Sequence, residues 1–375
     1  MLQWRLMNPR VSRDVLRWVV VAAALVSAAP ALRSAGQGVG GQLQTSPLDT
    51  LNQRLLEHYR GGRYAEGIPV ASEALRVAET TYGAQHPIVA ESLNNLAEMY
   101  RLLGRFAEAK PLYERALRIA ETSSSPEGIF VAAVLSNLAD LYRLQGAYAQ
   151  AEPLYRRAIV TREKLLGPEH ADLAQSLNSL ALLKAAEDKP QEAEPLYQRA
   201  MAIYRKALGD EDLLVAATMG NLAELYRSQQ KFAQAEPLYA KSLAIAEKKL
   251  GPESQTVLIY LNNQALLYAA QNKPRDAERL LQRVLAIKEK MYGRDTAASY
   301  TTLENLATVY QDQGRYRDAE PLWQRVLAIG EKAYGSDNPA LAAPLEAMAE
   351  AAKKLGRADE AARLQERARQ LTRRR

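Results

Sequence analysis

The sequence contains no cysteine among its 375 residues. Disulfide bonds, thiol nucleophiles, cysteine-ligated metal sites and lipid attachment at a lipobox cysteine are therefore excluded. Whatever holds this chain in its folded form is non-covalent.

Histidine, a frequent metal ligand and general base, occurs only three times, at His58, His86 and His170. None of the three has a carboxylate or another histidine at metal-ligand spacing. No serine lies in a nucleophile-elbow context, and the fragment GQGVGG has no preceding strand to make it a phosphate loop. We therefore expect that the protein is not an enzyme and that it binds no metal, no cofactor and no small-molecule substrate.

An excess of charge of one sign is also lacking. The formal net charge is +6, but residues 1–31 carry four arginines and one aspartate, so the remainder has 45 basic minus 42 acidic residues, or +3. Acidic and basic residues alternate, as in Glu98 and Arg101 or Asp140 and Arg143, which is typical of a solvated helical face. We expect no nucleic-acid partner.

Only one long hydrophobic run stands out, and it lies near the start. Four arginines between positions 5 and 17 precede the apolar segment from Trp18 to Leu32. This order predicts a secretory signal peptide over residues 1–31, with cleavage sites at Val26-Ser27-Ala28 or Ala29-Pro30-Ala31. The run is short for a membrane span, and an uncleaved anchor is the alternative. We expect export to the bacterial periplasm or beyond, with membrane attachment only if this segment stays uncleaved.

Residues 32–47 are rich in glycine, serine and glutamine and predict a flexible linker. From residue 48 to residue 375 one pattern recurs every 42 residues without insertion or deletion. Two of its columns are invariant: Ala97, Ala139, Ala181, Ala223, Ala265, Ala307 and Ala349, and Ala109, Ala151, Ala193, Ala235, Ala277, Ala319 and Ala361. The units lie near 48–82, 83–124, 125–166, 167–208, 209–250, 251–292, 293–334 and 335–375. A fixed period of this length predicts a solenoid with atypical end units.

Each unit predicts two helices, so the fold class is all-α. Asp212, Ser254, Thr296 and Asn338 stand where the first helix opens and are expected to cap it. The column that closes this helix favours a left-handed residue: Gly104, Gly146, Asp188, Gln230, Asn272, Gly314 and Gly356. The invariant alanines should let the two helices approach closely, and the tyrosine columns that include Tyr100 and Tyr113 are interpreted as core.

The strings NNLAEMYRLLGRFAEAKPLYERAL (94–117) and NLAELYRSQQKFAQAEPLYAKSLAIAEKKLG (221–251) resemble the tetratricopeptide repeat (TPR) of the kinesin-light-chain type. The resemblance covers about residues 48–375. It implies an α-solenoid, a right-handed superhelix of antiparallel helix pairs in about eight TPR units. It also implies that the first helices line a concave groove that holds a partner peptide.

An asparagine column on the first helix is the candidate binding site. Its members are Asn95, Asn137, Asn221, Asn263 and Asn305, and Glu98, Asp140 and Glu224 follow three of them on the same face. A carboxamide can donate to and accept from an extended peptide backbone at once. The alternative is that these amides tether the adjacent repeat or are merely solvated. Ser179 and Lys184 interrupt the asparagine and tyrosine columns in one unit.

Two classes of function follow from these features. The first is a non-enzymatic scaffold that binds an extended segment of a partner protein in the concave groove. The second is a structural or self-associating component of a larger assembly, tethered to the membrane if the start is uncleaved. The ladder of amides favours the first.

Overall fold

The computed structural model describes residues 46–123 and 128–373, so the predicted signal peptide and most of the predicted linker lie outside the described residues. The chain divides into two compact units, Met1–Leu225 and Tyr226–Arg375, with the division inside helix α11. Each unit is described by itself. Within the described residues the elements are helical, which confirms the all-α solenoid.

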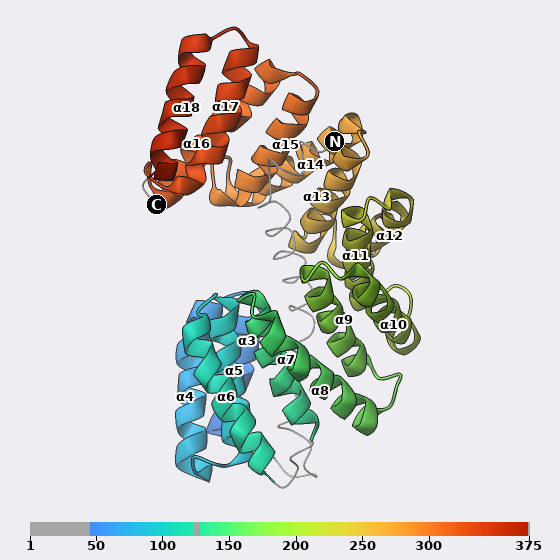
Figure 1. Ribbon diagram of the computed structural model, residues 1–375. Helices are drawn as coiled ribbons and strands as arrows, with labels where there is room; N and C mark the ends of the chain where they lie inside the picture. Colours follow the sequence, from blue (N-terminus) through green and yellow to red (C-terminus); the bar gives the residue numbers. More distant parts are fainter. Residues whose placement is uncertain (1–45, 124–127, 374–375) are drawn as a thin grey trace. The chain divides into compact units, whose positions relative to one another are not determined.

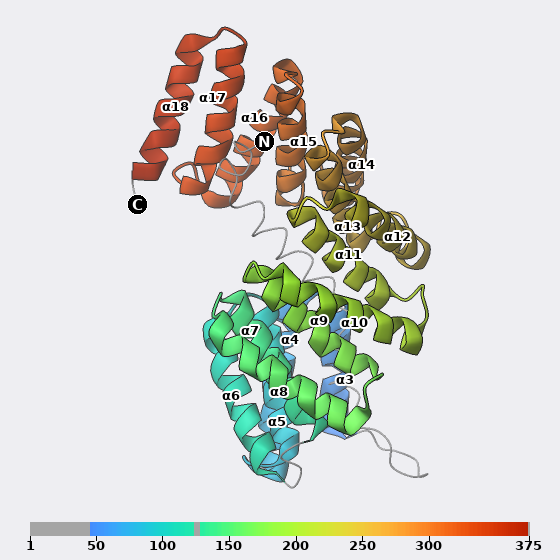
Figure 2. The same ribbon diagram turned by 45° about the vertical axis from the view of Figure 1, so that its right-hand side comes forward.

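The first compact unit is a series of antiparallel helix pairs (Figure 1). Its helices are α3 Pro47–Arg60, α4 Tyr64–Tyr82, α5 Pro87–Leu102, α6 Phe106–Thr122, α7 Ile129–Leu144, α8 Tyr148–Leu166, α9 Ala171–Ala186, α10 Pro190–Leu208 and α11 Leu213–Ser228. Each helix from α3 to α9 packs against the next, and α7 also contacts α5 and α9 (Figure 2). The first helices α5, α7 and α9 therefore lie side by side.

The second compact unit is also built from antiparallel helix pairs. It contains α12 Phe232–Leu250, α13 Gln255–Ala270, α14 Pro274–Tyr292, α15 Tyr300–Asp312, α16 Tyr316–Tyr334, α17 Ala342–Lys354 and α18 Ala358–Arg373. The short 3-10 turns η1 Ala297–Ser299 and η2 Pro339–Leu341 precede α15 and α17.

Most of the predicted caps are present. Asp212, Ser254 and Asn338 each accept a backbone N–H from the first turn of the helix that follows. The Thr296 cap is wrong, because this hydroxyl donates to the Gly293 carbonyl and a 3-10 turn follows. Two of the three histidines are caps that the sequence analysis missed, since Nδ1 of His86 and His170 accepts from Ile88 and Asp172. Their role is structural.

The close packing within each helix pair rests on the alanine columns. Members of both columns are fully buried, and even the least buried, Ala361, is only 5% exposed. The turn between the two helices of a pair uses the predicted left-handed residue, with φ of 59° at Asp188, 61° at Gln230 and 58° at Asn272. These non-glycine residues adopt a conformation that is open mainly to glycine and asparagine.

Ion pairs join the second helices of successive repeats. In the first unit Arg115 pairs with Glu79 at 2.7 Å and Arg157 with Glu121 at 2.5 Å. In the second unit Arg283 pairs with Glu247 at 2.7 Å and Arg325 with Glu289 at 2.6 Å. Such partly exposed pairs each contribute little to stability, so burial of apolar side chains between the helices dominates.

Candidate binding face on the first helices

The asparagines of the candidate site lie on the first helices of their repeats, and three of them bond to the preceding repeat. Asn137 donates from Nδ2 to Oδ1 of Asn94 at 2.9 Å. The same bond joins Asn221 to Asn178 at 3.1 Å and Asn305 to Asn262 at 3.0 Å. The amide tether that the sequence analysis kept as an alternative is therefore present at these junctions.

The same column differs in how much of each side chain reaches solvent. Asn95, Asn137 and Asn305 are partly exposed, whereas Asn221 and Asn263 are 3% and 2% exposed. Each tether uses one Nδ2 hydrogen and one Oδ1 atom, and a carboxamide offers two donors and an acceptor with two lone pairs. Hydrogen-bonding capacity therefore remains.

Two buried amide atoms of this asparagine column have no hydrogen-bond partner within residues 46–123 and 128–373. They are Oδ1 of Asn221 in the first unit and Nδ2 of Asn263 in the second. An unsatisfied buried polar atom costs about 1–3 kcal/mol. Such atoms in native proteins call for an explanation.

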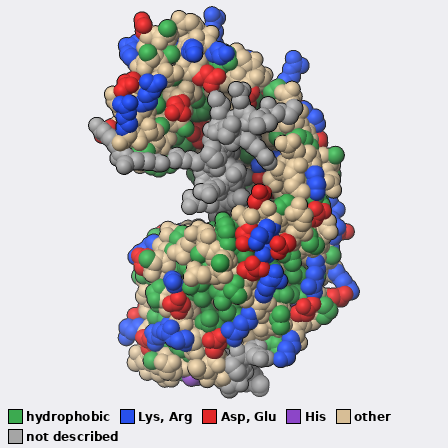
Figure 3. Space-filling model, viewed as in Figure 1, with side chains coloured by type: hydrophobic (Ala, Val, Ile, Leu, Met, Phe, Trp, Pro, Cys, Tyr) green, Lys and Arg blue, Asp and Glu red, His purple; other side chains and the backbone are tan. Residues whose placement is uncertain are grey.

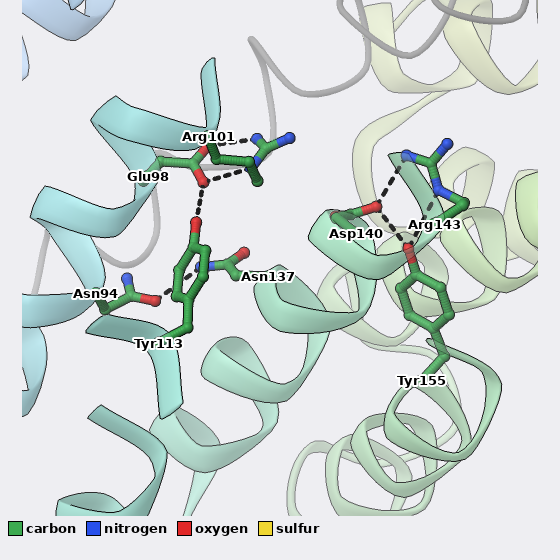
Figure 4. A network of polar contacts seen from close by, with 8 residues as sticks. All are labelled: Asn94, Glu98, Arg101, Tyr113, Asn137, Asp140, Arg143 and Tyr155. Atoms are coloured by element: carbon green, nitrogen blue, oxygen red, sulfur yellow. Dashed lines mark hydrogen bonds and ion pairs between the residues drawn. The ribbon is translucent and has the colours of Figure 1, made fainter. Parts of the chain in front are cut away.

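Glu98, predicted to line the groove, is instead the acceptor of a buried network (Figure 4). Its carboxylate accepts from Nε of Arg101 at 2.8 Å, from Nη2 of Arg101 at 2.5 Å and from the Tyr113 hydroxyl at 2.6 Å. Burial raises the pKa of Tyr113, and the Glu98 charge raises it further. The hydroxyl therefore stays protonated and donates.

The next repeat copies this network. Asp140 accepts from the Tyr155 hydroxyl at 2.6 Å and from Nη2 of Arg143 at 3.1 Å. Figure 4 shows the two networks and, next to Tyr113 in this view, the Asn94–Asn137 bond. Glu224 is partly exposed and has Arg227 and Tyr239 in the matching columns.

The interpretation of the alternating charges as a solvated face is wrong for the first two of these pairs. Arg101 and Arg143 are both only 8% exposed, and Glu98 is 6% exposed. The i, i+3 spacing shows that the two residues of each pair lie on the same side of the helix. That side packs against the second helix of the repeat, whose tyrosine hydroxyl donates to the acidic residue. The tyrosine column of the second helix could have predicted this network, because a buried tyrosine hydroxyl needs a hydrogen-bond acceptor.

The repeat that contains α9 departs from its neighbours, as the sequence indicated. Lys184 replaces the tyrosine, is 2% exposed and pairs with Glu152 at 2.8 Å, Glu187 at 3.2 Å and Glu192 at 3.2 Å. Burial alone would lower the pKa of Lys184, but these carboxylates raise it above its usual value. The hydrogen bond from Lys184 in turn lowers the pKa of Glu152.

We define the first-helix face of the first unit as Glu91, Asn95, Asn137, Gln175 and Ser179, all partly exposed side chains on α5, α7 and α9. On the side of the molecule drawn in Figure 3, basic and acidic side chains are interspersed. No group of three or more potential metal ligands is found among the described residues, and no helix in that part of the chain is long and apolar enough to cross a bilayer.

Comparison with known proteins identifies the repeat. The family model for the tetratricopeptide repeat matches residues 57–122, 130–206, 214–290 and 296–374. None of the curated proteins matches the chain.

Several solved structures are similar to this chain. The apo quorum sensor NprR from B. thuringiensis is 16% identical, with a TM-score of 0.64 over 96% of this chain and 98% of that one. BtubC (BKLC) from P. vanneervenii is 22% identical, with a TM-score of 0.51 over 65% of this chain and 92% of that one. TPR-like repeats of a Podosopora anserina protein assigned as a kinesin light chain are 28% identical, with a TM-score of 0.47 over 55% and 98%.

Proposed function

This chain belongs to the tetratricopeptide repeat family, and we propose that it is a non-enzymatic scaffold that binds an extended segment of another protein along its first helices. The observation that carries the proposal is the asparagine column. Its amides keep hydrogen-bonding capacity beyond the tethers that they form between repeats.

An extended peptide presents alternating N–H and C=O groups, and a carboxamide can satisfy one of each. Asn137 supplies Oδ1, which accepts no bond from the described residues, and Asn95 lies one repeat before it on the same face. The tethers hold Asn137 in one orientation, so less side-chain entropy is lost when a partner binds.

The unsatisfied amide atoms supply a second argument. Oδ1 of Asn221 would accept from a partner N–H, and Nδ2 of Asn263 would donate to a partner carbonyl. Either bond would remove the cost of a buried polar atom without a partner.

We also propose that the protein is exported, on the strength of the arginine-then-apolar order of residues 1–31. The partner would then be another exported protein or the exposed part of a membrane protein.

The experiment is site-specific photo-crosslinking in the full chain, in cells that express it naturally. A benzophenone amino acid replaces Gln175 on the first-helix face, and the matched control replaces Val160 on α8, which is 64% exposed. We expect a discrete adduct with one segment of a partner at position 175 only, and a synthetic copy of that segment should compete. Equal adducts at both positions, or none at position 175, would contradict the proposal. Adducts with a second copy of this chain would favour self-association.

A further inference from the structure

The first unit contains a buried cation without an acidic partner. Arg162 on α8 is 4% exposed, and it forms no ion pair with any residue in 46–123 or 128–373. Its hydrogen bonds come from Nη1 alone, to the hydroxyls of Ser136 at 3.3 Å and of Ser176. Burying a guanidinium without a carboxylate is costly, because hydroxyl groups replace only part of its hydration.

Comparison of the repeats shows that the fold does not require an arginine at the position of Arg162. The corresponding residues of other repeats are Ala78, Ala120, Tyr204, Ala246, Lys288 and Gly330. Lys288 is the one other cation among them, and its Nζ donates to the Thr302 hydroxyl at 2.9 Å. Ser136 likewise replaces the asparagine found at the positions of Asn94 and Asn178. Two departures from the repeat therefore meet at one junction, between α7, α8 and α9.

One edge of the Arg162 guanidinium has no partner. Nε is buried without a hydrogen bond in the described part of the chain, and no bond from Nη2 is found there either. Arg101 shows what this edge binds, since its Nε and Nη2 both donate to the Glu98 carboxylate. The two arginines thus differ in one respect, the missing carboxylate at Arg162.

The charge on Arg162 is retained despite its surroundings. Burial lowers the pKa of Arg162, while the charge of Asp172 opposes this shift. Arginine starts from a pKa far above neutrality, so the guanidinium stays protonated under physiological conditions.

We propose that Arg162, held by Ser136 and Ser176, is a binding site for a carboxylate that bonds side-on to the Nε/Nη2 edge, where no hydrogen bond is formed within the described residues. Its source is an acidic side chain or the chain end of the bound segment, so this part of the assignment rests on the proposed function. The two serines orient the fork and leave its other edge for the ligand. Arg162 then selects the partner, while the asparagines bind any extended backbone.

The test uses formate, the smallest carboxylate, because the guanidinium is almost fully enclosed. Formate is titrated against chloride at equal ionic strength into the full chain labelled with ¹⁵N-arginine, and the Nε–H signals are followed by NMR. We expect one signal to shift saturably with formate, and that signal to be missing in Arg162→Met. The matched control, Arg157→Met, changes a half-exposed arginine of the same helix and should retain the shift. Arg162→Lys keeps the charge but not the fork and should weaken formate binding roughly 10- to 150-fold.

Two blocked pentapeptides distinguish the sources of the carboxylate. One has a central aspartate in polyglycine, with both ends capped, and the other is polyglycine with a free carboxyl end. One of them should reproduce the formate shift, and an asparagine version of the first should not. The site is overturned if formate causes no saturable shift, or if the shifted signal persists in Arg162→Met. If formate shifts the signal but neither peptide does, the carboxylate does not come from a bound segment. This outcome is independent of the crosslinking result at position 175.

Discussion

The Tyr113 hydroxyl on α6 donates to the Glu98 carboxylate on α5 at 2.6 Å, across the two helices of one repeat. Both residues are buried, and Arg101 occupies the rest of the carboxylate. A side chain predicted to meet a ligand is therefore part of the joint between two helices.

Tyr113→Phe should lower the free energy of unfolding by about 1–3 kcal/mol, because the Glu98 carboxylate would lose a donor where water has little access. Tyr197→Phe is the matched control, since Tyr197 is 1% exposed but has Leu182 in the column of Glu98. Local hydrogen exchange of the affected helix pair measures both. Equal losses of protection in the two variants would contradict the role given to the hydroxyl.

Ala223→Leu should destabilise the protein by about 1–3 kcal/mol, because Ala223 is 0% exposed between packed helices and a larger side chain would force them apart. Ala207→Leu, at an exposed position of α10, should change stability by less than about 0.5 kcal/mol. Urea denaturation followed by circular dichroism compares the two. A tolerated leucine at position 223 would contradict the packing of the alanine column.

The Lys184 cluster should make stability depend on pH at both extremes. The pKa of Glu152 is lowered from 4.5, so its contribution is present above that value and is lost as the pH falls through the lowered pKa. The pKa of Lys184 is raised from 10.5, so its contribution is present below that value and is lost as the pH rises through the raised pKa.

Lys184→Tyr, which restores the residue found in the neighbouring repeats, tests this dependence. We expect the stability difference between the wild type and this variant to be constant between the two pH limits and to change outside them. Thermal midpoints measured from pH 3 to pH 11 give the comparison. A difference that stays the same below pH 4.5 would show that Glu152 does not draw stability from Lys184.

Asn221→Ala and Asn263→Ala should separate tethering from binding. Asn221 donates to Asn178, so its loss should cost stability as well as partner affinity. Nδ2 of Asn263 has no partner, so Asn263→Ala should reduce affinity for the recovered segment roughly 2- to 12-fold and barely change the thermal midpoint. Calorimetric titration and thermal denaturation of both variants supply the four values. Unchanged affinity in Asn263→Ala would count against the amide ladder.

The mature protein should begin between Ala29 and Leu32, because small residues follow the apolar run there. N-terminal sequencing of protein recovered from the periplasm or medium measures this directly. Exported material that still starts at Met1 would show that the segment is not cleaved and would favour the membrane anchor.

Local features of the fold could be predicted because their causes are local. The alanine columns recur at one register, and helix geometry places each of them on the buried side. The left-handed residues at Asp188, Gln230 and Asn272 close the first helix at the predicted position. The caps formed by His86 and His170 were not predicted, because histidine is not among the preferred N-cap residues.

The candidate site was less predictable because its partners come from other helices. Asn137 bonds to Asn94 across a junction, at an offset of one period plus one residue, and the repeat period does not reveal that contact. Glu98 and Arg101 share one side of α5, and only the arrival of Tyr113 from α6 makes that side buried. The sequence does not distinguish Arg162 from other charged residues, because its contacts with Ser136 and Ser176 form only when α8 packs against α7 and α9.

The sequence by itself determined the period, the helix pairs, the tight alanine joints and the family, because each depends on residues a few positions apart or on one repeated register. Only the tertiary structure decided which polar side chains face inward, which amides are tethered and which cation lacks a counter-charge. Burial and pairing are properties of the space between helices, and that space exists only after successive repeats have packed.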